Sequence, residues 1–152
     1  MASASLLGLF LAAFLAATPL PFQSEVVFLA VQATGEFSPW LLVLLASVGN
    51  TLGSCVTYAV GRGLGGARTS RWFPVTPEQM ARAEAWFQRW GLWSLLLSWA
   101  PGGDVIVALS GMLRVPFSQF LALVALAKTL RYIAVALAAA GALQLWFGVG
   151  AA

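Results

Sequence analysis

The sequence contains no histidine and only one cysteine, Cys55. Without histidine there can be no Ser-His-Asp triad, no Cys-His dyad and no histidine ligand to a metal ion. A lone cysteine also excludes an internal disulfide and a CxxC metal motif. We therefore expect no metal site and no cofactor, and we expect that the protein is not an enzyme.

Charge is scarce as well. Charged residues make up 9% of the chain and hydrophobic residues 61%, whereas soluble domains carry about 25% charged residues. A chain of 152 residues has too little interior to bury that much apolar surface, so lipid is the expected solvent. The net charge of +3 comes without a dense basic run, which argues against nucleic acid. Anionic membrane lipid is the expected partner of the arginines.

The apolar segments are of two lengths. A helix needs about 20 residues to cross the hydrocarbon core, and residues 40–60 and 117–147 meet that requirement. The first rises about 31 Å and the second about 46 Å, so the second must tilt, kink or protrude. Four other apolar segments are too short to cross: residues 6–17, 26–33, 92–99 and 105–112.

The first twenty residues have the length and the small residues of a secretory signal. No lysine or arginine precedes them, however, and hydrophobic sequence continues beyond them. We expect this segment to stay in the protein as part of one membrane domain, residues 1–152.

Residues 62–91 form the one clearly polar stretch and contain a helix start. Thr76 is the expected N-cap, Pro77 fits the first helical position, and Gln79 completes a capping box. Gly91 is the expected end. An apolar face combines Met80, Ala83, Phe87 and Trp90. This pattern predicts a short amphipathic helix on the membrane surface, and packing against protein stays open as the alternative.

Two stretches share one pattern: a short apolar segment, a proline, an acid and a second short apolar segment. The acids are Glu25 and Asp104, and a turn and a full-length span follow each stretch. We interpret residues 3–61 and 92–148 as two copies of one unit, with residues 62–91 as the cytoplasmic connection. The residues expected at the two tips are Pro19, Pro21, Pro101, Gly102 and Gly103.

Such interrupted helices predict re-entrant hairpins. Non-helical backbone survives at membrane depth only where protein or a wet cavity surrounds it, and paired broken helices mark binding sites in transporters. Six of the eight basic residues lie in residues 62–91 or at Arg114, which the positive-inside rule assigns to the cytoplasm. The hairpins then enter from opposite faces as an inverted repeat. A single kinked crossing by residues 6–33 remains an open alternative.

Four ionisable residues fall inside apolar segments: Glu25, Asp104, Lys128 and Arg131. Each would cost about 2.5–3.5 kcal/mol at the centre of a membrane helix. Lys128 and Arg131 are three residues apart, so they share one helix face. One interpretation makes the acids structural caps at helix starts, where the dipole favours negative charge. The other makes all four a substrate and proton-coupling site.

Three stretches carry a resemblance to a known family: PLPFQSE at residues 19–25, GNTLGSCVTYAVGRGLG at 49–65, and SWAPGGDVIVALSGMLRVPFSQF at 98–120. In this order they resemble the DedA family, also called the VTT or SNARE-associated membrane domain. Ser98 and Asp104 stand near positions where most members carry arginines. This departure, with AKTLRY at residues 127–132, is similar to the small YqaA-like branch.

The family's glycine, tyrosine and arginine positions correspond to Gly49, Gly53, Gly61, Tyr58 and Arg62. The first two glycines form a small-xxx-small face that favours close helix packing. For Tyr58 and Arg62, an interface anchor and a site role both stay open.

The resemblance implies a multi-pass protein of the bacterial inner membrane, with two re-entrant hairpins in an all-α fold. It also implies movement of a lipid or a polyisoprenyl phosphate across the membrane, with protons as the coupling ion. A homo-oligomer is a further expectation. Two alternatives belong to other classes: a non-transporting assembly or envelope-integrity scaffold, and a membrane enzyme acting on lipid phosphate, which the lack of histidine disfavours.

Overall fold

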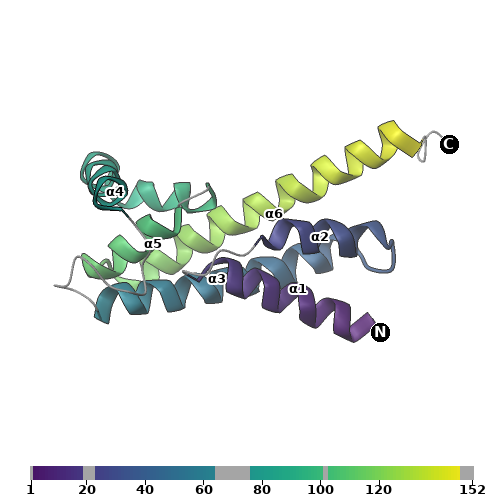
Figure 1. Cartoon of the computed structure of the whole chain (residues 1–152), viewed down its shortest axis with the longest axis horizontal. Coiled ribbons are helices and arrows are strands. Elements are labelled where there is room, and N and C mark those ends of the chain that lie inside the picture. The colour runs from purple at the N-terminus through teal and green to yellow at the C-terminus, as the bar shows by residue number, and fades with distance from the viewer. Residues whose placement is uncertain (1, 19–22, 64–75, 101–102, 148–152) are drawn as a thin grey trace.

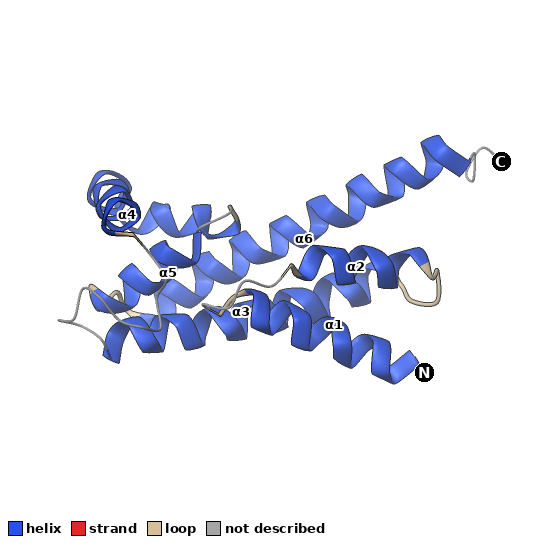
Figure 2. Cartoon of the chain, viewed as in Figure 1, coloured by secondary structure: helices blue, strands red, loops and turns tan. Residues whose placement is uncertain are grey.

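The computed structural model describes residues 2–18, 23–63, 76–100 and 103–147, and all regular structure in these ranges is helical (Figure 2). The expectation of an all-α chain is confirmed for these residues. The helices, in chain order, are α1 (Ala2–Ala16), α2 (Ser24–Ala33), α3 (Pro39–Gly63), α4 (Pro77–Trp90), the 3-10 helix η1 (Gly91–Trp99), α5 (Gly103–Met112) and α6 (Phe117–Phe147).

Among the described residues, two helices are long and apolar enough to cross a bilayer: α3 over Pro39–Gly63, and α6 over Phe117–Ala142. Both were predicted. The α3 helix is slightly longer than predicted at each end, and α6 begins and ends at the predicted residues. The C-terminal part of α6 extends beyond the other helices (Figure 1), as expected for a helix longer than the bilayer core is thick.

The short helices form two pairs at opposite ends of the long axis (Figure 1). The α1 helix packs against α2, and η1 packs against α5. The end of α1, the start of α2, the end of η1 and the start of α5 all face the middle of the molecule. Residues 19–22 and 101–102, and with them Pro19, Pro21, Pro101 and Gly102, lie outside the described residues.

The sequence pattern did not predict that η1 would be a 3-10 helix. Its hydrogen bonds span three residues, as in the bond from the Ala100 N–H to the Leu97 carbonyl, 2.9 Å long. A 3-10 helix rises about 2.0 Å per residue instead of 1.5 Å. The tighter winding carries a nine-residue segment farther toward the middle of the molecule than an α-helix would reach.

Glycines on α3 bring its backbone into contact with the backbones of α1 and α5. A Cβ atom on Gly49 would lie 2.6 Å from the carbonyl oxygen of Phe10, and one on Gly53 would overlap the carbonyl of Phe14. Toward its other end, α3 meets α5, where a Cβ on Gly61 would overlap the carbonyl of Ala108. Small residues at membrane helix contacts permit this approach. The α3 helix therefore holds a short helix on each half of its length.

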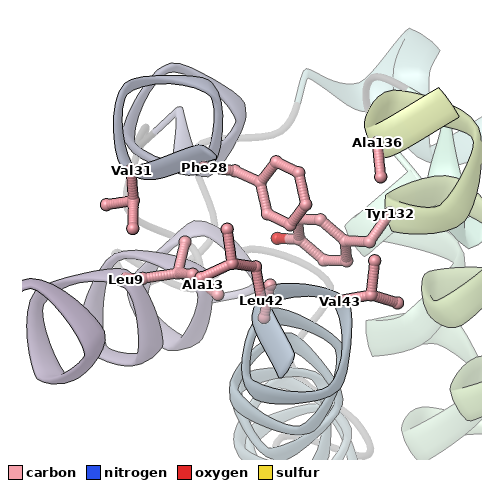
Figure 3. Close-up of a cluster of buried hydrophobic side chains, with 9 residues drawn as sticks. Leu9, Ala13, Phe28, Val31, Leu42, Val43, Tyr132 and Ala136 are labelled. Atoms are coloured by element: carbon pink, nitrogen blue, oxygen red, sulfur yellow. The ribbon is translucent and has the colours of Figure 1, made fainter. Parts of the chain in front are cut away.

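The apolar interior consists of two clusters. The first joins α1, α2, α3 and α6, and Figure 3 shows Phe28 next to Tyr132 at its centre. The second lies toward the other end, around Tyr58, and includes Leu95, Val107, Val115, Phe120 and Val124. Each cluster thus joins one pair of short helices to both long helices.

The α4 helix begins as predicted. The Thr76 side chain accepts a hydrogen bond from the Gln79 backbone N–H, and the Gln79 side chain accepts one from the backbone N–H of Thr76. Phe87 packs against the second cluster, while Trp86 and Trp90 stack on each other and are half exposed. The helix therefore packs on protein and also presents an aromatic surface. The side chains of Met80 and Ala83 lie outside the described residues.

Candidate functional site

The four ionisable residues of the apolar segments meet in two ion pairs. Asp104 and Lys128 approach to 3.4 Å between Oδ1 and Nζ, and Glu25 pairs with Arg131 through Oε1 and Nη2. Both acids lie in the first turn of a short helix, Glu25 on α2 and Asp104 on α5. Both cations lie on α6.

This arrangement follows from the helix geometry. Because Lys128 and Arg131 are three residues apart, both project from the same side of α6. Lys128 reaches the start of α5 and Arg131 reaches the start of α2. These two short helices belong to the pairs at opposite ends of the molecule (Figure 1). The two starts come from parts of the chain far apart in sequence, and α6 links them. Positive and negative charges balance, so the site is neutral while both acids are ionised.

The two pairs differ in exposure. The Lys128 side chain is 2% exposed and that of Asp104 34%. In the other pair, the Arg131 and Glu25 side chains are 26% and 27% exposed. Lys128 is thus sealed inside the helix bundle, whereas Arg131 can be reached from outside.

A second contact stands beside the Glu25–Arg131 pair. The hydroxyl groups of Ser24 and Tyr132 hydrogen-bond at 2.7 Å, and both residues are buried. The Tyr132 ring also packs against Phe28, with ring centroids 5.6 Å apart (Figure 3). Two successive residues of α2 are therefore held by two successive residues of α6. Sequence analysis missed this contact, although each partner adjoins an ionisable residue in the chain.

Side chains of α3 bind the end of α1. The Asn50 side chain donates to the Ala13 carbonyl at 2.8 Å, and the Thr57 hydroxyl donates to the Ala17 carbonyl at 2.7 Å. The last carbonyl groups of a helix have no partner within that helix, and in hydrocarbon each would be costly. These bonds let α1 end inside the protein. They were not predicted, because Asn50 and Thr57 gain a meaning only once α1 lies beside α3.

The same face of α3 carries further buried polar atoms. The side-chain oxygens of Ser47, Asn50 and Ser54 have no hydrogen-bond partner among the described residues. Buried polar atoms are nearly always paired in proteins, by other groups or by water.

Tyr58 and Arg62 connect the end of α3 to the segment between α5 and α6 by hydrogen bonds. The Tyr58 hydroxyl donates to the Val115 carbonyl at 2.6 Å and accepts from Arg62 Nη1 at 2.9 Å. The ring of Tyr58 stacks on Phe120 at 4.4 Å. The structure thus places both residues at the α5–α6 turn, away from the ion pairs, and gives them a structural contact there.

Gly103, expected at the second tip, lies where α5 begins against the end of η1. A Cβ on Gly103 would lie 2.6 Å from the Cα of Ser98. This close contact places the Asp104 turn directly against η1.

Comparison with known proteins identifies the family. The profile of the VTT domain matches residues 19–141, which is most of the chain. The chain belongs to the VTT-domain, or DedA, family. It is 40% identical over 143 residues to inner membrane protein YqaA of Escherichia coli strain K12, an alignment that covers 93% of this chain and 96% of that protein. The Shigella flexneri protein of the same name is equally similar.

A third relative is an uncharacterized protein of Haemophilus influenzae, 37% identical over 142 residues and covering 86% of this chain and 84% of its own length. No solved structure matches the chain. The family and the two apolar long helices make this a bacterial inner-membrane protein, as predicted from composition and motifs.

Proposed function

We propose that the protein moves a lipid or a lipid phosphate across the inner membrane and couples this movement to protons. In this proposal the α1–α2 and η1–α5 pairs are re-entrant hairpins that enter from opposite faces as an inverted repeat. The observation that carries the proposal is the pairing of Glu25 with Arg131 and of Asp104 with Lys128. Charge inside a membrane domain is costly and usually marks a transport path or a proton relay.

The charge balance gives a reason for coupling. While both acids are ionised, each cation is occupied and an anionic phosphate gains little net attraction. Protonation of Glu25 would remove its charge and free the Arg131 guanidinium, whose fork can bind phosphate through two hydrogen bonds. Loss of that proton toward the other side would restore the ion pair and release the phosphate. The start of α2 would add favourable dipole potential for the anion.

A scaffold does not need this chemistry. A protein that only assembles others gains nothing from two ion pairs whose acids lie on separate short helices, and it would function with all four residues neutral. An enzyme would alter its lipid, whereas a transporter returns it unchanged. We propose that the partners are membrane lipids and protons and that the protein is not an enzyme.

Reconstitution in liposomes tests the proposal. The purified protein is given a panel of fluorescent phospholipids and isoprenyl phosphates, with and without an imposed pH gradient, and the lipids are recovered for mass analysis. We expect one anionic class to cross unaltered, faster with the gradient. Glu25→Gln should abolish the response to the gradient, and Asp104→Asn should do so equally or more weakly.

Glu36→Gln is the matched control, because Glu36 is an exposed acid between α2 and α3, and this variant should behave as the wild type. If both Glu25→Gln and Asp104→Asn respond to the pH gradient as the wild type does, the two acids act only as structural caps of their helices. Absence of any lipid movement would favour the scaffold.

A further inference from the structure

Arg131 takes part in more than its ion pair, because it also lines an open apolar groove of about 360 Å³ between η1 and α6. The other residues that line this groove are Leu96, Trp99, Leu126, Ala127, Leu130 and Ala134. Trp99, Leu126 and Leu130 are each at least half exposed. The groove therefore opens on the outer surface of the helix bundle, where lipid surrounds a membrane protein.

The groove combines a hydrocarbon surface with one cation. A guanidinium carries five N–H donors, and one donor nitrogen of Arg131 serves Glu25. Glu25 is the acceptor of Arg131 among the described residues, so the other N–H groups of the guanidinium can serve a second acceptor. A second groove of similar size, about 390 Å³, runs between α3 and α6, and the residues that line it include no charged side chain. The other cation, Lys128, is sealed inside the bundle.

We propose that the η1–α6 groove is the lateral binding site of an anionic lipid phosphate. The phosphate lies at Arg131, and the hydrocarbon chain lies along Leu96, Trp99 and Leu130. Charge complementarity selects this occupant: an uncharged apolar chain would leave the guanidinium unused, and a free phosphate would leave the apolar walls unused. The inference deepens the proposed function by fixing the route by which the lipid reaches Arg131 from the bilayer without detaching its chain.

The inference also explains the difference between the two ion pairs. A lipid approaching sideways meets the partly exposed pair of Glu25 and Arg131 and does not meet Lys128. Its phosphate competes with the Glu25 carboxylate for the same guanidinium. Binding in the groove and loss of charge on Glu25 then favour each other, which is the linkage that proton coupling requires.

Photo-crosslinking tests the groove separately from transport. Leu130 is replaced by p-benzoylphenylalanine, and the full-length protein is placed in vesicles that contain phosphatidic acid and diacylglycerol with identical chains. In the Glu25→Gln background, where the Arg131 guanidinium has lost its competing carboxylate, we expect adducts with phosphatidic acid to exceed those with diacylglycerol about tenfold, since hydrogen bonds to a charged group give discrimination of this order. Leu44 is the matched control, because it is an exposed leucine in the uncharged groove. There the ratio should stay near one.

Variants of the cation complete the test. Arg131→Gln should bring the ratio at Leu130 to about one. Arg131→Lys should keep only part of the preference, because the charge remains but the fork that makes two hydrogen bonds is lost. An excess of water-soluble glycerol phosphate should compete poorly, because it lacks the chain. Equal ratios at Leu130 and Leu44, a preference that survives Arg131→Gln, or full displacement by glycerol phosphate would each overturn the inference.

If Arg131→Gln does not fold, the comparison of Leu130 with Leu44 still decides, because it uses the native arginine. The lipid site in the groove and the proposed transport function can be contradicted independently of each other. Selective adducts without lipid movement in liposomes would contradict transport and leave the groove standing. Lipid movement without selective adducts would do the reverse.

Discussion

At the scale of single residues, the unequal burial of the two ion pairs predicts unequal costs of breaking them. Asp104→Asn would leave Lys128, 2% exposed, as an unpaired buried cation, a change that typically costs about 3–5 kcal/mol. Glu25→Gln would leave Arg131 with partial access to its surroundings, so its loss should be smaller. We expect Asp104→Asn to lower the midpoint of thermal unfolding in detergent clearly more than Glu25→Gln.

The double variant Asp104→Asn/Lys128→Met provides the control, since it removes both charges and should recover part of the lost stability. Equal midpoints for the two single variants would contradict the burial argument.

Arg131 should be indispensable for transport of an anionic lipid. Arg131→Ala removes the guanidinium that the phosphate would bind, and we expect the transport rate in liposomes to fall about tenfold or more while the protein still inserts. Arg89→Ala, on an exposed position of α4, should transport at the wild-type rate. An unchanged transport rate in well-inserted Arg131→Ala protein would contradict binding of the phosphate at Arg131.

At the scale of the helices, the backbone contacts of the α3 glycines predict which substitutions lower stability, which the spacing of these glycines alone does not. Gly53→Ala and Gly61→Ala would each drive a methyl group into a backbone carbonyl of a neighbouring helix. Backbone cannot move aside as a side chain tip can, so overpacking should cost about 1–3 kcal/mol. Both variants should unfold at lower temperature in detergent.

Gly141→Ala on α6 is the comparison. A Cβ there would meet nothing within 4 Å, and alanine is the better helix former by about 0.5–1 kcal/mol. Its unfolding midpoint should therefore hold or rise. A loss as large as that of Gly53→Ala would show that the glycines act through helix propensity and not through contact.

Much of this helical arrangement could be predicted because it depends on local pattern. Segment length fixed α3 and α6, and Thr76 with Gln79 fixed the start of α4. The acids Glu25 and Asp104 were predicted as candidate site residues because charge is so rare in the apolar segments, and the structure pairs each with a cation of α6. Such signals are contained within a few consecutive residues.

What escaped prediction depends on tertiary neighbours. Serine and tyrosine are common in membrane helices, so neither Ser24 nor Tyr132 stands out until α2 lies beside α6. The same holds for Asn50 and for the exposure of Arg131 to a groove, which requires η1 in place. The 3-10 form of η1 also had no marker in its apolar composition.

At the scale of the whole molecule, α6 is the element that links the two halves. It contacts both pairs of short helices, through Arg131 at one and Lys128 at the other. The α3 helix holds the same two pairs through backbone contacts at Gly53 and Gly61. Both long helices therefore pack against both halves, and α6 adds an ion pair to each. Ion pairs can exchange partners where close-packed backbones cannot, so any movement between the halves should centre on α6.

The orientation of the molecule in the membrane yields the last prediction. The N-terminus and the α2–α3 connection lie at one end of the long axis and α4 at the other (Figure 1). The arginines of residues 62–91 favour the cytoplasm for the α4 end. In a Cys55→Ser background, we therefore expect Gln88→Cys to react with an impermeant thiol reagent only from the cytoplasm. Ser3→Cys and Glu36→Cys should react only from outside, and all three positions are exposed.

Labelling of Ser3→Cys from the cytoplasm, with Glu36→Cys still outside, would mean that residues 6–33 cross the membrane once as a kinked helix. Labelling of Gln88→Cys from outside would invert the molecule and contradict the assignment based on the arginines.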